Sequence, residues 1–206
     1  MTLPNKLGIS EAAELAREEE RRSKQKAALL FESGLLDSLP AGTFAGLAMI
    51  HRYLFGDIYD FAGQLRTVNL AKGGFRFAPV LYLDAALERI DAMPQETFDD
   101  IVAKYVEMNV AHPFREGNGR SMRIWLDALL KKSLGKVVDW SRTDRDAYLQ
   151  AMERSPVCDE EIRKLLHAAL TDRTADRALY MKGIDASYHY EGYYAFRTED
   201  LKPDSQ

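Results

Sequence analysis

Residues 112–123 constrain the fold more than any other part of the sequence, because they place a tight turn between two helices. The twelve residues read His-Pro-Phe-Arg-Glu-Gly-Asn-Gly-Arg-Ser-Met-Arg. Apolar residues at helical spacing lead up to His112, and Pro113 stops that helix. Gly117 and Gly119 form a turn that leads into a second helical series. The sequence therefore predicts a glycine turn at a helix N-terminus.

The residue types in this run suit a site for a metal-bound polyphosphate. Backbone N–H groups of residues 117–119, together with the positive end of the helix dipole, attract an anion. Arg120 and Arg123 lie on one helix face and can grip phosphate oxygens as forks. Glu116 offers the hard oxygen ligand that Mg²⁺ prefers. His112, with an ordinary pKa of about 6.5, can accept a proton from a hydroxyl at cellular pH.

For any single residue of this run, a surface loop between two helices is the alternative interpretation. The complete set favours phosphate chemistry, because each residue type meets a separate demand of that chemistry.

The run resembles the signature of the Fic family, His-Pro-Phe-x-x-Asp/Glu-Gly-Asn-Gly-Arg-x-x-Arg, and meets each of its fixed positions. The resemblance implies an all-α fold, a compact helical bundle with one short β-hairpin called the flap. It also implies a protein adenylyltransferase, which moves AMP from ATP to a Tyr, Ser or Thr hydroxyl of a target protein and releases pyrophosphate. Gly119 stands where the kinase-like toxin branch of the family has a lysine, so the chain resembles the nucleotidyl-transferring branch.

The resemblance also assigns roles to the residues of the run. His112 would be the general base, Phe114 an anchor of the loop at the nucleotide, and Glu116 the Mg²⁺ ligand. ATP would be held by an anion hole formed by Gly117, Asn118 and Gly119. It would also be held by two cations, Arg120 and Arg123.

Composition limits the chain to one sizeable domain and narrows its partners. With 206 residues, 46% of them hydrophobic, it can form a real core but hardly a second full domain. The net charge of −4 gives no general attraction to nucleic acid or to an anionic membrane, which favours a protein or nucleotide partner. A single cysteine, Cys158, excludes an internal disulfide framework. Because we find neither an apolar run of membrane-spanning length nor a signal peptide pattern, we expect a cytoplasmic chain.

Helical periodicity covers most of the remaining sequence. The first helix should run from Ser10 to Ser33, with the charge run 17–26 as its solvated face. His51 falls on the apolar face of the next helix and is expected to be a core histidine. Later helices should start at a Thr143-x-x-Asp146 capping box and at Ser155-Pro156. We expect three segments: an N-terminal helix and connector (1–40), the Fic core (41–172) and a C-terminal inhibitory segment (173–206).

Glycines interrupt the helical pattern between residues 66 and 79 and predict a short hairpin. Residues 67–70 lead into the turn and residues 75–77 lead out of it. By resemblance this hairpin is the flap, which aligns an extended target segment by strand addition. The expected target-positioning residues are Lys72, Gly73, Gly74, Phe75 and Arg76. An ordinary surface hairpin is the alternative.

A second informative stretch lies near the C-terminus. Asp185 can cap a short helix, Gly192 can end it, and Ser187 and Glu191 share one helix face. The stretch resembles the inhibitory motif Ser/Thr-x-x-x-Glu-Gly/Asn of self-inhibited Fic proteins, formed here by Ser187, Glu191 and Gly192. That resemblance implies that Glu191 pairs with Arg123 and obstructs the γ-phosphate of ATP, since a carboxylate competes with phosphate for the same cation.

Several further expectations remain open at this stage. Tyr188 could be modified by its own chain once the terminal helix loosens. Glu191 could instead orient water for the removal of AMP, or the chain could be an inactive binding module with a Fic shell. By family analogy, the ATPase subunits of type II topoisomerases are one candidate target, and a homo-oligomer could hold the terminal helix in place.

Overall fold

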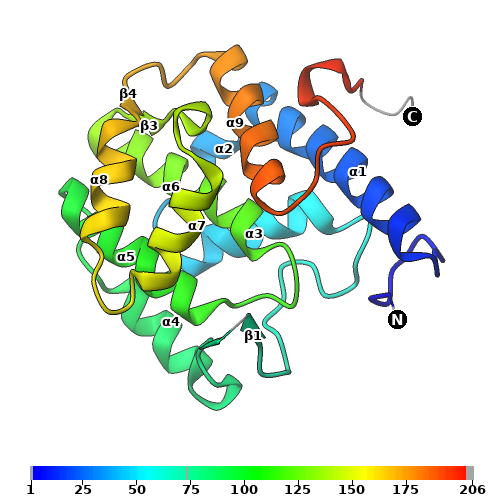
Figure 1. The fold of residues 1–206 in the computed structure, drawn as a ribbon, viewed down its shortest axis with the longest axis horizontal. Helices are drawn as coiled ribbons and strands as arrows, with labels where there is room; N and C mark the ends of the chain where they lie inside the picture. Colours follow the sequence, from blue (N-terminus) through cyan, green and yellow to red (C-terminus); the bar gives the residue numbers. More distant parts are fainter. Residues whose placement is uncertain (1, 73, 203–206) are drawn as a thin grey trace.

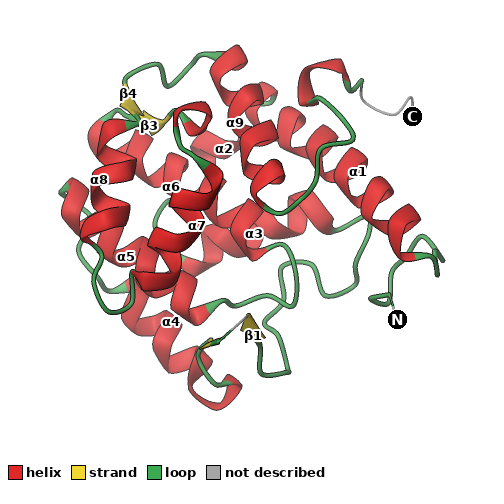
Figure 2. Cartoon of the chain, viewed as in Figure 1, coloured by secondary structure: helices red, strands yellow, loops and turns green. Residues whose placement is uncertain are grey.

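The computed structural model describes residues 2–72 and 74–202, and most of these residues lie in helices (Figure 1, Figure 2). The α-helices are α1 (Ala12–Glu32), α2 (Leu35–Ser38), α3 (Phe44–Phe55), α4 (Leu83–Asp91), α5 (Phe98–Ala111), α6 (Asn118–Leu134), α7 (Arg145–Arg154), α8 (Glu160–Ala168) and α9 (Arg177–Tyr190). The expected all-α class with a short hairpin is confirmed. No helix among the described residues is both long and apolar enough to cross a membrane.

Two small antiparallel strand pairs accompany the helices. The flap consists of β1 (Ala71–Lys72) and β2 (Phe75–Arg76), so its first strand begins one residue after the predicted 67–70. The second pair, β3 (Val137–Val138) with β4 (Leu170–Thr171), was not predicted. Two-residue strands are too short to show the alternating pattern that identifies a strand in a sequence. Short 3₁₀ helices span Val80–Tyr82, Trp140–Arg142 and Thr198–Asp200.

Helix α6 lies at the centre of the fold, because α3, α5 and α9 all pack against it. Trp125, Leu126 and Leu129 on this helix are fully buried. A helix enclosed on several sides has to be apolar over more than one face. Gly117 immediately before α6 and Gly135 immediately after it both have positive φ angles, which glycine adopts without strain. The predicted glycine turn at a helix N-terminus is therefore confirmed.

Helix α5 delivers His112 to the turn. The helix ends at His112, whose φ of 48° lies in the left-handed region, and Pro113 follows. Arg66 stabilises this uncommon conformation by donating from Nε to the carbonyl of His112 at 2.7 Å and from Nη2 to that of Ala111 at 3.1 Å. The predicted end of the helix is confirmed.

Helix α1 has nearly the predicted bounds, but the exposure of its charged residues differs from the prediction. The expectation that the charge run 17–26 is a solvated face is wrong, because Glu19, Glu20 and Lys24 are buried. Helix α9 and the C-terminal segment pack on this face, as the neighbouring ribbons of α1 and α9 show (Figure 1). Lys24 pairs with Glu20 at 3.0 Å and with Asp185 of α9 at 3.1 Å. Buried charges on α1 therefore attach the terminal helix to the core.

The terminal helix starts earlier than predicted. Asp185 was expected to cap a short helix, but the cap is Asp176, and Asp185 lies in the middle of α9. Gly183, which precedes the predicted start, is helical and lies against Trp140, where an added Cβ would come within 3.3 Å of the indole. The close contact with Trp140 explains why this position is a glycine. Gly192 ends the helix with a φ of 88°, as predicted.

Two other predicted helix starts are wrong by a few residues. Asp144, one residue after Thr143, caps α7 by accepting from the N–H of Ala147 at 2.9 Å. Ser155 ends α7, and α8 begins only after Asp159. At α7 the neighbouring Asp144 takes the capping role expected of Thr143, which local sequence cannot resolve.

Candidate active site

The loop after His112 is shaped by a buried phenylalanine and by an asparagine that spans the turn. Phe114 is fully buried and stacks on His51, with ring centroids 3.8 Å apart. Asn118 donates from Nδ2 to the carbonyl of Phe114 at 2.7 Å and accepts from its N–H at 2.9 Å. The burial of Phe114 supports its role as an anchor but leaves no side-chain surface for nucleotide. The side chain of Asn118 likewise binds the loop itself.

His51 supports the same loop from α3, and its prediction as a core histidine is confirmed. Its two ring nitrogens bond the carbonyl of Glu116 at 2.8 Å and the N–H of Gly63 at 2.9 Å. Burial lowers the pKa of His51 to about 4, so the ring is neutral and one nitrogen can accept while the other donates.

The N-terminus of α6 offers free hydrogen-bond donors. The first helical bond runs from the N–H of Ser121 to the carbonyl of Gly117 at 3.1 Å. The N–H groups of the first turn have no acceptor within the helix, and they belong to Asn118, Gly119 and Arg120. This geometry suits an anion.

The carboxylate of Glu191 lies directly over this N-terminus. A Cβ added to Gly119 would collide with Oε1 of Glu191 and approach Nη1 of Arg123 at 3.1 Å. Because Gly119 has no side chain, the carboxylate of Glu191 can occupy this space. Because a carboxylate resembles a phosphate in charge and in its oxygen acceptors, the contact marks the space as an anion site.

Arg123 binds the terminal helix through three hydrogen bonds. It donates to Oγ of Ser187 at 2.6 Å, to the Ser187 carbonyl at 2.8 Å and to Oε1 of Glu191 at 3.0 Å. Burial opposes ionisation of Glu191, yet Arg123 and then Lys72 lower its pKa to about 2. The predicted pairing of Arg123 with Glu191 is confirmed, and Ser187 belongs to the same contact.

Arg120 does not point toward a phosphate site, contrary to the role expected of it. Its guanidinium is fully buried and donates to Glu19 at 2.6 Å and to Glu116 at 3.2 Å. The guanidinium also lies 4.8 Å from the ring of Phe55 and 4.6 Å from that of Tyr193. The structure therefore makes Arg120 a support for the loop and for the carboxylate of Glu116.

Glu19 is the site residue that the sequence analysis missed. Besides Arg120, it accepts from the hydroxyls of Tyr59 and Tyr193. A signal existed, because Glu19 lies four residues after Leu15 and eight before Ala27, which are both buried, and therefore on the apolar face of α1. Its position within a charge run concealed this.

His112 is a half-buried imidazole on the other side of the glycine turn. Its ring stacks on Phe77 with centroids 3.7 Å apart, and within the described residues its Nδ1 has no hydrogen-bond partner. Burial, followed by the positive charge of Arg66, lowers the pKa of His112 to about 4. The ring is consequently neutral at cellular pH, which a proton acceptor requires.

Glu116 is the carboxylate suited to a divalent cation. Its side chain is 47% exposed, and Oε1 accepts from the N–H of Gly117 at 2.9 Å. In the described part of the chain, no group of three His, Cys, Asp or Glu residues could hold a metal alone. One carboxylate is sufficient for a magnesium ion that takes its other ligands from phosphates and water.

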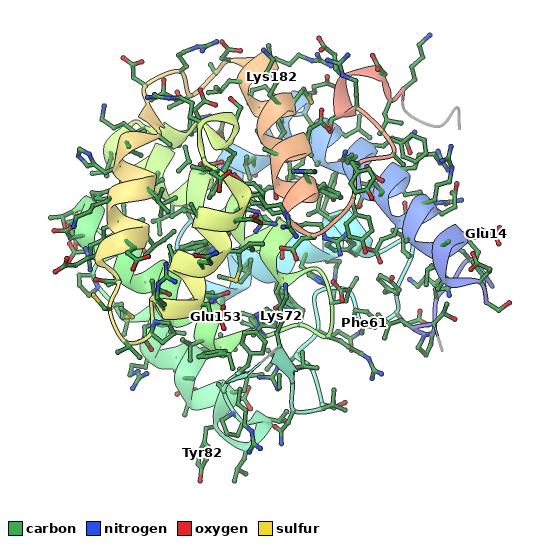
Figure 3. All side chains as sticks on the ribbon, in the orientation of Figure 1. Glu14, Phe61, Lys72, Tyr82, Glu153 and Lys182 are labelled. Carbon is green, nitrogen blue, oxygen red and sulfur yellow. The ribbon has the colours of Figure 1, made fainter. Side chains whose placement is uncertain are left out.

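The flap connects to both halves of the site. Its Phe77 covers the imidazole of His112, and the ammonium of Lys72 lies 3.6 Å from Oε2 of Glu191. Lys72 lies on the side of the flap nearest the helices, whereas Tyr82 points away into solvent (Figure 3). Gly74 and Arg76 are exposed, and Gly73 falls outside the described residues. Target positioning by these residues stays a prediction.

Tyr188, the candidate for self-modification, is fully buried beneath the charged groups of α1. Its ring lies 5.3 Å from the guanidinium carbon of Arg120 and 5.3 Å from the ammonium of Lys24. With α9 in this position, its hydroxyl cannot reach the active site. Tyr194, by contrast, is 78% exposed.

The buried pair of Glu19 and Arg120 allows a stability test. In Glu19→Ala, Arg120 keeps its charge but loses its buried counterion, and we expect a loss of about 3–5 kcal/mol in the free energy of unfolding. Urea denaturation measures the loss. The matched control is Glu18→Ala, whose more exposed carboxylate pairs with Arg21 and Arg22 and should contribute less than about 1 kcal/mol. Equal losses in the two variants would refute the proposed support.

Comparison with known proteins agrees with this geometry. The model of the Fic/DOC family matches residues 43–130. The chain is 30% identical over 198 residues to the probable protein adenylyltransferase Fic of Salmonella typhimurium, covering 91% of this chain and 90% of the relative. It is 29% identical over 185 residues to the protein adenylyltransferase VbhT of Bartonella schoenbuchensis, covering 84% of this chain and 38% of that relative.

Solved structures share the fold at lower sequence identity. The BepC protein of Bartonella tribocorum, crystallised with AMPPNP, matches with a TM-score of 0.69 and 21% identity over 83% of this chain and 93% of that one. The N-terminal Fic domain of a cell filamentation protein from Bartonella quintana, crystallised with ADP, matches with a TM-score of 0.70 and 21% identity over 84% of this chain and 93% of that one. The relatives and the site together define a nucleotidyltransferase. The chain belongs to the Fic/DOC family.

Proposed function

We propose that this protein transfers AMP from ATP to a hydroxyl side chain of a target protein, and that Glu191 inhibits the transfer by binding Arg123. The contact that supports this most directly is the Glu191 carboxylate, which lies over Gly119 at the N-terminus of α6. An anion in that place, held by an arginine, marks where the ATP phosphates would bind.

The residues of the loop match the chemistry of nucleotidyl transfer. The target hydroxyl gives its proton to the neutral His112 while its oxygen attacks the α-phosphorus of ATP. A new oxygen–phosphorus bond forms, the bond from the α-phosphorus to the oxygen bridging to the β-phosphorus breaks, and pyrophosphate leaves. The free N–H groups of the first turn of α6 stabilise the negative charge that develops on the phosphate oxygens.

Magnesium fits this site through Glu116, which has an accessible carboxylate at the edge of the anion site. A bound Mg²⁺ supplies positive charge that offsets the phosphates. The buried guanidinium of Arg120 orients that carboxylate from behind.

Glu191 inhibits because it competes with an outer phosphate of ATP for Arg123 and for the space over Gly119. Ser187 and Glu191 take the donors at Nε and Nη2 of Arg123, and Oε1 of Glu191 occupies the space over Gly119 that an outer phosphate would need. An ionised Glu191 also repels an incoming phosphate. The protein is therefore active when α9 releases Glu191 and inactive when it does not, an equilibrium that a few kcal/mol can control.

The flap suits an extended segment of a target protein. Strand addition to the flap would place a hydroxyl beside His112, because Phe77 joins the flap to the imidazole. Type II topoisomerase ATPase subunits are one candidate target by family analogy. The direct test incubates a lysate with the Glu191→Gly variant and α-labelled ATP, then identifies AMP-modified proteins by mass spectrometry. Absence of label on every protein would overturn the proposed activity.

We expect the transfer rate to stay constant as the pH is lowered, until the pH lies well below the ordinary pKa of histidine. His112 acts as a base only when neutral, and burial together with Arg66 holds its pKa at about 4. The negative charge of Glu191 raises the pKa of His112. Removing Glu191 therefore cannot shift the loss of rate in acid to a higher pH. In Glu191→Gly we therefore expect a nearly constant rate from about pH 8 to about pH 6. A fall centred near pH 6.5 would mean that the imidazole is solvated in the active form.

A further inference from the structure

Helix α9 forms one wall of a partly open cavity. The cavity has a volume of about 230 Å³ and lies between α6, α9, α1 and the segment around Trp140. A cavity of about 150 Å³ is known to hold a benzene molecule, so this one can hold an aromatic ring with a short side arm. Gly183 widens it, since it presents no side chain toward Trp140.

The walls of the cavity are mainly apolar, with aromatic rings on several sides. Phe31 and Tyr180 stack on one another with centroids 4.5 Å apart, and Trp140, Ile124 and Ile184 also line the space. A ligand for such walls has an apolar, preferably aromatic, body.

One carboxylate in the wall has no cation. Asp127 of α6 accepts from the N–H of Val138 at 2.8 Å and from the indole of Trp140 at 2.8 Å, and among the described residues it forms no ion pair. Burial raises the pKa of Asp127 to about 7, while the two donors oppose this. A carboxylate with two oxygens has acceptor capacity beyond these two bonds.

Every other charged side chain of the cavity wall is already paired. Lys131 pairs with Asp37 at 2.5 Å, and Arg173 pairs with Asp176. Arg123, which also lines the cavity, pairs with Glu191. Among the described residues, Asp127 is thus the anion of this wall that lacks a counterion, and a cationic ligand would supply one.

We propose that this cavity binds a small organic cation, an amine with an apolar aromatic body, whose ammonium pairs with Asp127. The ligand would touch α6 through Asp127 and Ile124 and α9 through Gly183 and Ile184. It therefore binds the arrangement in which α9 is docked, and it favours that arrangement over the released one. Because Arg123 and Ser187 also line the cavity, the ligand contacts the residues that hold Glu191.

Binding can be tested on the wild-type chain with a matched pair of probes. Phenethylamine carries the ammonium, and 2-phenylethanol is a neutral molecule of nearly the same shape. At about pH 8, calorimetry should give phenethylamine an affinity about tenfold or more above that of the alcohol. Equal affinities, or no binding of either probe, would overturn the proposal.

Two variants locate the binding. Asp127→Asn should remove the preference for the amine, although its amide would face two donors and could destabilise the fold. Ala128→Leu avoids this difficulty, because it adds side-chain volume to the cavity wall from α6 and keeps Asp127 with its two donors. It should weaken both probes, and unchanged binding in Ala128→Leu would place the probes elsewhere and refute the site.

The effect on α9 is measured separately. In the wild-type chain, phenethylamine should slow amide hydrogen exchange across residues 177–190, and unchanged exchange would refute the stabilisation of the docked helix. The expected inhibition of AMP transfer rests on the proposed function, whereas binding and exchange do not. A probe that binds and slows exchange in a chain without transferase activity would thus leave the site intact and count against the proposed function alone.

Discussion

Replacing Glu191 with glycine is expected to raise AMP transfer by about tenfold or more. The variant removes an ionised carboxylate from the space over Gly119 and takes away the anion that competes with an outer phosphate for Arg123. The rate is measured as label transferred from α-labelled ATP to protein. Gln in the same place keeps the volume without the charge, so Glu191→Gln should lie between wild type and Glu191→Gly.

The matched control for this prediction is Glu199→Gly. Glu199 is an exposed glutamate of the same C-terminal segment, with no role in the site. Its replacement should leave the rate unchanged. If Glu191→Gly and Glu199→Gly gave the same rate as wild type, Glu191 would not be an inhibitor.

Replacing His112 with alanine in the Glu191→Gly background is expected to lower transfer by about 10²–10⁴-fold, the usual contribution of a general base. The neutral imidazole lies at the mouth of the anion site and has a lowered pKa, which fits a proton acceptor. ATP affinity should change little, because the anion site is formed by α6 and Arg123 and not by the imidazole.

His167→Ala provides the comparison for the His112 variant. His167 lies on the exposed side of α8 and contacts the ring of Phe98. It should retain full transfer. A His112→Ala protein as active as His167→Ala would remove the base from the proposed mechanism and leave only electrostatic stabilisation.

The centre of the site could be predicted from the sequence because its signals are local. Residues 112–123 are contiguous, and a helix end, a glycine turn and a helix start follow from proline, glycine and apolar spacing. The contact between Arg123 and Glu191 spans 68 residues, and it was predicted only because a known motif connects the two positions.

What could not be predicted depends on long-range packing. Glu19 reaches Arg120 across 101 residues, and this pairing turns an expected phosphate ligand into a buried support. The burial of Lys24 likewise follows from the return of the C-terminal segment to α1. Nothing in a charged stretch indicates which of its residues will be covered by a helix far along the chain.

Lys72 connects the flap to Glu191 through an ion pair. Because Lys72 is 71% exposed, its attraction for Glu191 contributes no more than about 1 kcal/mol. A target strand that draws this ammonium away weakens the hold on Glu191 by that amount, a factor of about five at most. Reciprocity requires that release of Glu191 strengthens target binding by the same factor. If Glu191 inhibits the transfer as proposed, a target protein that binds the flap contributes to activating its own modification.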